Sequence, residues 1–205
     1  MKEQIMKKVF LSMLILCTAI FHLSAEESDW FAEKFPEKLI TSSGKEVNTS
    51  EALKGKIVLV YFSASWCCPC RAFTPQLIKF YKKTAKKEKL EIVLAGFDKT
   101  EDAMKKYMKK YSMPWLAVPF GDDSISKLKR EAKVNVIPHL IVYDCEGKML
   151  SSNARWDVSV LGTAAVSAWK DQEYKPKTIQ YFQEKKKKKS NKSKKSRKSG
   201  KKQKK

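Results

Sequence analysis

The chain has 205 residues, 42% of them apolar, which is enough for one domain with a hydrophobic core and rules out a chain too polar to fold. The net charge is +21, but 14 Lys or Arg and no acid fall within residues 185–205. Most of the basicity therefore belongs to one end of the chain and indicates little about the fold.

Residues 1–25 have the pattern of a secretory signal peptide. Lys7 and Lys8 form a basic start, residues 9–23 are mostly apolar, and Ala25 is a small residue of the kind found at cleavage sites. The apolar run is short for a membrane span, which needs roughly 20 residues. We therefore expect an exported protein, periplasmic or secreted after cleavage near Ala25; the alternative is an uncleaved membrane anchor.

From residue 26 onward, strand and helix patterns alternate. The run at 57–62, IVLVYF, is continuously apolar, too short for a helix and rich in β-branched residues, so it predicts a buried central strand. In chain order we expect a helical or irregular lead-in at 26–38, a hairpin at 39–47, a short helix capped by Ser50 and ended by Gly55, the strand at 57–62, a helix at 68–86 containing Pro75, a strand at 91–97, a helix at 101–110 capped by Thr100, an extended segment at 113–120, a helix at 123–132, strands at 139–143 and 148–150, and a helix at 157–170.

This order of elements predicts an α/β fold with a central mixed β-sheet flanked by helices. Right-handed crossovers would make the strands at 57–62, 91–97 and 139–143 parallel to one another. The tight turn at 144–147 would make the last two strands antiparallel.

Composition divides the mature chain into three parts. The folded domain is expected at 26–170 and a linker at 171–184. Residues 185–205 are low-complexity Lys and Ser, with too few apolar side chains to fold, so we expect a disordered basic tail. Clustered lysines attract polyanions in a salt-dependent way, so nucleic acid, anionic lipid or an acidic polymer is a candidate partner of this tail.

Four cysteines remain after the predicted signal peptide, namely Cys67, Cys68, Cys70 and Cys145. Three of them fall within four positions, whereas a disulfide-stapled secreted scaffold spreads its cysteines along the chain. The clustering therefore indicates redox or metal chemistry.

The segment WCCPCR lies where the central strand passes into a helix. Cys67 should sit at the helix N-terminus, where unpaired N–H groups and the helix dipole favour a thiolate. Cys70 lies three residues further, on the same face and within reach, so it can resolve a mixed disulfide formed by Cys67. Trp66 and Pro69 should fix the turn and shield the mixed disulfide, and Arg71 should place a cation near the sulfurs.

Two further cysteines and one proline need separate treatment. A bridge between Cys67 and Cys68 would join Cα atoms about 3.8 Å apart, below the usual disulfide range, so Cys68 is expected to be free and partly exposed. Cys145 lies in a turn far from the motif and is interpreted as incidental. Pro138 precedes a strand, which suggests a special backbone such as a cis peptide bond; an ordinary proline at a strand start is the alternative.

Four motifs in order carry a resemblance to a known family. They are VYFSASWCCPCRAFTPQLIKFY (60–81), EIVLAGFDKTED (91–102), MPWLAVPF (113–120) and VIPHLIVYDCEGKML (136–150). Over roughly residues 38–150 the chain resembles the tryparedoxin and nucleoredoxin branch of the thioredoxin superfamily. The resemblance implies a thioredoxin-like fold, a disulfide reductase activity without a cofactor, and a cis-proline facing the redox centre.

Carried over by this resemblance, Trp66, Cys67, Cys70, Arg71 and Pro138 match the family pattern. Asp98 aligns with an acidic or polar position after the second strand of the motif region.

The chain departs from that pattern at three points. The family usually has WCPPC, and here Cys68 replaces the first proline. Thioredoxins proper bury an acid in the strand before the motif, a place that Tyr61 takes here, as a tyrosine does in tryparedoxins. The signal peptide and lysine tail are similar to those of exported bacterial thioredoxin-like proteins instead.

Three functions are compatible with the sequence. The first is a thiol–disulfide oxidoreductase, mainly a reductase, that acts on disulfides of exported proteins and takes electrons from an unidentified thiol donor; its direction depends on its reduction potential. The second is a metal chaperone that holds a soft ion such as Cu(I) with Cys67, Cys68, Cys70 and His139. The third is an anion-binding protein that uses the lysine tail and keeps the domain only as a scaffold.

Overall fold

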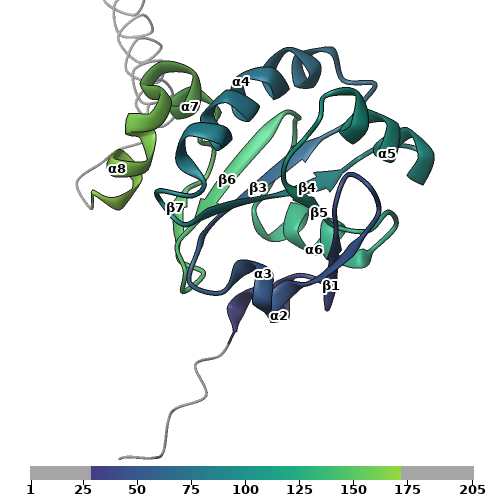
Figure 1. Ribbon diagram of the computed structural model, residues 1–205, viewed down its shortest axis with the longest axis horizontal. Helices are drawn as coiled ribbons and strands as arrows, with labels where there is room; N and C mark the ends of the chain where they lie inside the picture. The colour runs from purple at the N-terminus through teal and green to yellow at the C-terminus, as the bar shows by residue number, and fades with distance from the viewer. Residues whose placement is uncertain (1–28, 172–205) are drawn as a thin grey trace, which may run out of the picture.

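The computed structural model describes residues 29–171, which form one mixed sheet with helices on both faces (Figure 1). The predicted signal peptide at 1–25, the linker beyond Asp171 and the tail at 185–205 lie outside the described residues and stay predictions. The elements are α2 (Trp30–Lys34), β1 (Lys38–Ile40), β2 (Glu46–Asn48), α3 (Thr49–Leu53), β3 (Ile57–Ser63), α4 (Cys68–Thr84), β4 (Leu90–Gly96), α5 (Glu101–Lys110), β5 (Leu116–Ala117), α6 (Asp123–Glu131), β6 (His139–Tyr143), β7 (Met149–Ser151), α7 (Arg155–Leu161), the 3-10 turn η1 (Gly162–Ala164) and α8 (Ala165–Lys170).

The strand β3 is a buried interior strand of the sheet, as its continuous apolar run predicts. The sheet order is β2-β1-β5-β4-β3-β6-β7, and all seven residues of β3 are buried. Successive side chains of a strand point to opposite faces. Leu59 and Tyr61 accordingly join the core under α4, α5 and α8, whereas Val58 and Val60 join the core under α2, α3 and α6.

The predicted parallel arrangement of three strands is wrong for the third. The strand β4 pairs with β3 in parallel, but β6 pairs with β3 antiparallel, with Phe62 opposite His139. The strand β5 is parallel to β4 and ends where the carboxyl ends of β3 and β4 lie. After α6 the chain enters β6 from that same end of the sheet, so β6 runs in the opposite direction. The rule of right-handed crossovers applies only to connections that cross to the opposite end of the sheet before the next strand begins. The connection before β6 does not cross, and the sequence pattern did not reveal this.

Helix ends match the sequence in one case and differ in two. Thr100 caps α5 as predicted, because its Oγ1 accepts the Ala103 N–H at 3.1 Å. The cap of α3 is Asn48, whose Oδ1 accepts the Glu51 N–H at 3.1 Å, and Ser50 lies inside the helix. The single helix expected at 157–170 is divided into α7 and α8, because Gly162 adopts a φ of +55°.

The helix α2 is fixed to the sheet by an aromatic contact. The ring of Trp30 lies 4.7 Å from that of Tyr143, centroid to centroid, and covers the β6–β7 turn. Gly147 in this turn has a φ of +83°, and a Cβ atom there would lie 2.3 Å from the Trp30 ring. This position therefore needs glycine for both its backbone and its space.

We expect Gly147→Ala to destabilise the protein more than Gly121→Ala. Gly121 has a similar φ of +81° but nothing within 4 Å of an added Cβ, so its replacement should cost only the backbone term, about 1–2 kcal/mol. Gly147→Ala should cost about 1–3 kcal/mol more because it also displaces Trp30. Urea unfolding at equilibrium measures both; equal losses would mean that Trp30 does not pack on this turn in solution.

Candidate active site

The loop that leaves β3 is held by groups at the end of β4. Asp98 Oδ1 accepts hydrogen bonds from the backbone N–H and the hydroxyl of Ser65, the first of them at 2.9 Å. The Trp66 indole N–H donates to the Phe97 carbonyl at 2.9 Å, while 55% of the Trp66 residue remains exposed. The parallel pairing of β3 and β4 places both strand ends at one edge, so the two loops meet there.

At the end of this loop Cys67 and Cys70 form a disulfide. Their sulfur atoms are 2.20 Å apart and their Cα atoms 5.2 Å apart. Cys67 is the N-cap of α4, and its Sγ accepts the Cys70 N–H at 3.2 Å. This is one of the N–H groups that a helix start leaves without a helical partner, and it favours negative charge on the sulfur. Cys67 is 6% exposed and Cys70 fully buried, so Cys67 is the sulfur nearer the surface.

The segment before β6 lies against this disulfide. The Ile137–Pro138 peptide bond is cis, one of the two alternatives that the sequence left open. The Ile137 carbonyl oxygen lies 3.8 Å from Cys67 Sγ, and Arg155 Nη1 donates to the Pro138 carbonyl at 3.0 Å. The antiparallel pairing of β6 with β3 is what brings Pro138 to the same edge of the sheet as Cys67.

The Arg71 side chain binds Cys68 rather than the disulfide. Its guanidinium donates to the Ser65 carbonyl at 2.8 Å and to Cys68 Sγ at 3.1 Å. Cys68 is free and exposed, as expected from its spacing, and so is Cys145. The cation expected near the sulfurs is therefore bound to Cys68, while the disulfide is polarised by the start of the helix.

A buried hydroxyl network beneath the disulfide was not anticipated from the sequence. The Tyr61 hydroxyl lies 3.0 Å from Thr74 Oγ1, which donates to the Cys70 carbonyl at 2.9 Å and lies 2.7 Å from the Tyr107 hydroxyl. Ser63 Oγ completes it, 3.0 Å from the Tyr107 hydroxyl. Burial raises the pKa of Tyr61 above its usual value, so its phenol remains protonated. The spacing of Thr74 four residues after Cys70 was the available signal, because a helical Thr often bonds the carbonyl four residues back.

The residues named for the metal alternative are engaged elsewhere. His139 Nε2 lies 2.7 Å from the Ser152 carbonyl oxygen, and burial lowers the pKa of this imidazole. Cys67 and Cys70 are joined to each other, and Cys68 is bound by Arg71. Between residues 29 and 171, no group of three or more His, Cys, Asp or Glu is placed to hold a metal ion. The same part of the chain contains no helix with the length and apolar character needed to cross a bilayer.

Exposed apolar side chains belong to the segments that hold the disulfide. Trp66, Val136 and Trp156 are 55%, 66% and 52% exposed. A groove of about 290 Å3 between α4 and α7 opens beside them and is lined by Pro69, Ala72, Phe73, Gln76, Pro138, Arg155, Trp156 and Ser159. The redox end of the domain therefore presents an apolar contact surface.

The chain is similar to proteins of known families. Residues 55–149 match the model of a family described as thioredoxin-like. Probable nucleoredoxin 1 of Arabidopsis thaliana is 37% identical over 143 residues, which are 69% of this chain and 24% of that protein. The chain spans about a quarter to a third of the length of the nucleoredoxins that it matches. Tryparedoxin of Trypanosoma brucei brucei is 43% identical over 119 residues, which are 57% of this chain and 80% of tryparedoxin.

The chain belongs to the thioredoxin-like family. A solved tryparedoxin II, complexed with glutathionylspermidine, has a TM-score of 0.61 and 36% identity, covering 65% of this chain and 94% of that one. The expected thioredoxin-like fold is confirmed, and Cys67 and Cys70 are the CxxC pair of this family member.

We expect Asp98→Ala to destabilise the domain by about 1–3 kcal/mol, because two donors of Ser65 lose a charged acceptor in a nearly buried place. Asp98→Asn, which retains an acceptor oxygen, should recover part of the loss. Equilibrium unfolding in urea measures both variants. If Asp98→Ala is as stable as the unchanged chain, the contact does not hold the loop.

Proposed function

We propose that the protein is a thiol–disulfide oxidoreductase that works mainly as a reductase of protein disulfides. The observation that carries this proposal is the disulfide at the start of α4, with its nearer sulfur at the surface and bonded to a helical N–H group. The family relationship supports it. The activity needs no cofactor, because the two cysteines themselves carry the two electrons.

The reaction follows from the geometry of the pair. In the reduced protein the Cys67 thiolate attacks one sulfur of a substrate disulfide, forming a mixed disulfide and releasing the other substrate sulfur as a thiolate. Cys70 then attacks Cys67 Sγ, which releases the second substrate thiolate and leaves the Cys67–Cys70 disulfide seen here. An external donor, either one dithiol or two monothiols, then reduces this disulfide and is itself oxidised to a disulfide. The mixed disulfide forms at a place bordered by Trp66, Pro69 and Pro138. The loop that leads to Cys67 is held by hydrogen bonds from Ser65 to Asp98 and from Arg71 to the Ser65 carbonyl.

The apolar surface around the disulfide supports a polypeptide substrate. Apolar side chains on either side of a substrate cysteine can pack against the exposed Trp66, Val136 and Trp156. The donor is a low-molecular-weight or protein thiol, of the class to which glutathionylspermidine in the tryparedoxin II complex belongs.

Export and the basic tail belong to the same proposal. The signal-like residues 1–25 support action on disulfides of exported proteins, in a periplasm or outside the cell. The 14 Lys or Arg of residues 185–205 support retention on a polyanion.

Cys67→Ser should abolish the reduction of insulin disulfides with dithiothreitol as electron donor. Its partner Cys70 is fully buried and cannot replace it as the attacking sulfur. Cys145→Ser, at an exposed free cysteine, is the matched control and should keep the full rate. An active Cys67→Ser protein would contradict the proposed function.

Cys70→Ser should instead accumulate a covalent complex through Cys67, because the resolving thiol is absent. Non-reducing electrophoresis followed by peptide mapping detects it. Cys68→Ser should not accumulate such a complex, since Cys68 is exposed and bound to Arg71 rather than to Cys67. If only Cys68→Ser traps substrate, the resolving role belongs to Cys68.

A further inference from the structure

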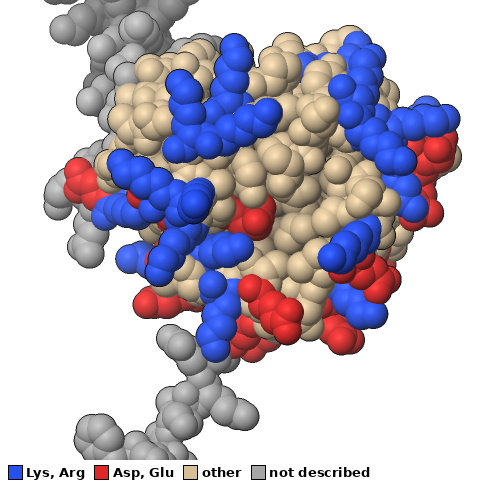
Figure 2. Space-filling view, viewed as in Figure 1, with Lys and Arg blue, Asp and Glu red and all other residues tan. Residues whose placement is uncertain are grey.

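Lysines are concentrated around the C-terminal end of α4, on the side of the domain away from the disulfide. Figure 2 shows Lys and Arg side chains crowded over the left part of the displayed face. A cavity of about 580 Å3 lies where the end of α4 meets the turn after α3, and four lysines line it. We define the lysine face as Lys54, Lys56, Lys79, Lys82, Lys83, Lys86, Lys87 and Lys89.

Acidic groups neutralise little of this charge. Glu88 pairs with Lys170 at 3.0 Å and with Lys87 at 4.0 Å, and Glu91 pairs with Lys56 at 3.8 Å. Within residues 29–171, the other members of the lysine face form no ion pair, and all are exposed: Lys54, Lys79, Lys82, Lys83, Lys86 and Lys89.

The helix itself does not account for so many lysines. The C-terminus of a helix carries about half a negative charge, which one lysine already offsets. Lys79, Lys82, Lys83 and Lys86 are three or four residues apart, so their like charges repel one another and destabilise the helix end. A surface with this much unbalanced charge is explained by an anionic partner.

The lysine face is separated from the redox centre along α4. The helix begins at Cys68 and has 17 residues, and Lys79, the first lysine of the face on it, lies about 16 Å further along the helix axis. This exceeds the Debye length of about 8 Å at physiological ionic strength, so the lysine charges do not act on the sulfurs. A partner bound here leaves the disulfide accessible.

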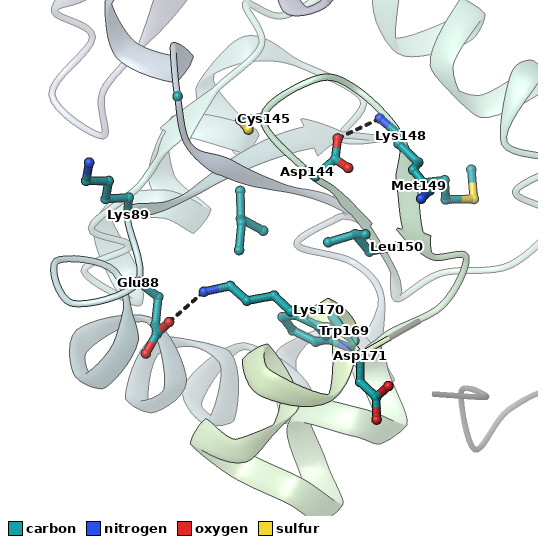
Figure 3. Close-up of a pocket in the computed structure, with 12 residues that line it drawn as sticks. Glu88, Lys89, Asp144, Cys145, Lys148, Met149, Leu150, Trp169, Lys170 and Asp171 are labelled. Carbon is teal, nitrogen blue, oxygen red and sulfur yellow. Dashed lines mark hydrogen bonds and ion pairs between the residues drawn. The ribbon is translucent and has the colours of Figure 1, made fainter. Parts of the chain in front are cut away.

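Both ends of the described chain lie beside the lysine face. A second cavity, of about 700 Å3, adjoins the first because Gly55 and Lys89 line both (Figure 3). Asp171 and Cys145 also line it, and Trp30 packs against the turn that carries Cys145. The described chain thus ends at Asp171 beside the lysine face.

We propose that the lysine face binds the surface of a bilayer containing anionic phospholipids and holds the domain with its disulfide directed away from the lipid. An extended anionic surface can contact the whole lysine face at once, whereas a small anion could contact only a few of its lysines. The three cavities that the face borders have no arginine in their linings, and their aromatic residues Phe80, Tyr81 and Trp169 are buried or half-buried. Arg-to-guanine contacts and stacking on exposed aromatic rings are the usual means of reading nucleic acid.

The proposal is tested by comparing how tightly two variants of the full chain, each lacking four lysines, bind to lipid vesicles. The lysine-face variant combines Lys82→Gln, Lys83→Gln, Lys86→Gln and Lys89→Asn, and its control combines Lys109→Gln, Lys110→Gln, Lys127→Gln and Lys133→Asn. Lys89 and Lys133 both have a positive φ, of 47° and 52°, which asparagine tolerates, so the backbone effects match. Circular dichroism and thermal unfolding confirm that both variants fold.

A lysine close to an anionic bilayer strengthens binding by about fivefold. On equimolar phosphatidylglycerol and phosphatidylcholine vesicles, we therefore expect the lysine-face variant to bind at least about tenfold more weakly than the control. Neither should bind phosphatidylcholine alone. Equal binding of the two variants overturns the proposal. A loss confined to duplex DNA, with vesicle binding unchanged, assigns the face to nucleic acid and also overturns it.

The two free cysteines of the described chain report the orientation independently of redox activity. Cys145 lies beside the lysine face and Cys68 at the redox end, and both are exposed. Anionic vesicles should slow maleimide labelling of Cys145 several-fold and leave that of Cys68 unchanged, as measured by peptide mapping. Protection of Cys68 instead, or of neither cysteine, contradicts the proposed orientation.

Discussion

The antiparallel pairing of β6 with β3 is the constraint on which the redox site depends. Because His139 lies opposite Phe62, the chain enters β6 at the edge where β3 ends. The Ile137 carbonyl and Pro138 are thereby brought against Cys67, which is some 70 residues earlier in the sequence. A parallel β6 would begin at the opposite end of the sheet, and the Ile137–Pro138 segment would not lie against the disulfide.

The two sulfurs of the disulfide differ in exposure and in hydrogen bonding. Cys67 caps α4, accepts a backbone N–H and lies next to apolar groups that remain exposed. Cys70 is enclosed, and its carbonyl is anchored by Thr74 in a network of buried hydroxyl groups. The helix start and the partial exposure thus fit Cys67 for the proposed attack on a substrate, and burial fits Cys70 for the proposed second step. Tyr61 supplies a neutral hydroxyl where an acid would introduce charge beneath the sulfurs.

The same helix separates two kinds of surface. Its first turn lies in an apolar environment suited to contact with a polypeptide, and its last turns carry exposed lysines without acidic partners. Since even Lys79 lies about 16 Å along the helix axis from Cys68, about two Debye lengths at physiological salt, each surface can engage its partner without altering the electrostatics of the other. Cys68 and Arg71 belong to the redox end, and there the exposed thiol bound by a guanidinium is the feature in which this chain departs from the usual WCPPC pattern.

The sequence by itself determined the elements whose signals are local. The apolar run of β3, the Thr100 cap and the cysteine spacing at a helix start depend on neighbouring residues, so the central strand, α5 and the CxxC pair could be predicted. The direction of β6, the contact between Ile137 and Cys67, and the network linking Tyr107 to Ser63 join segments far apart in the chain. Only the tertiary structure decided these, because a hydrophobic pattern specifies which face of a strand is buried but not the edge from which the chain enters the sheet.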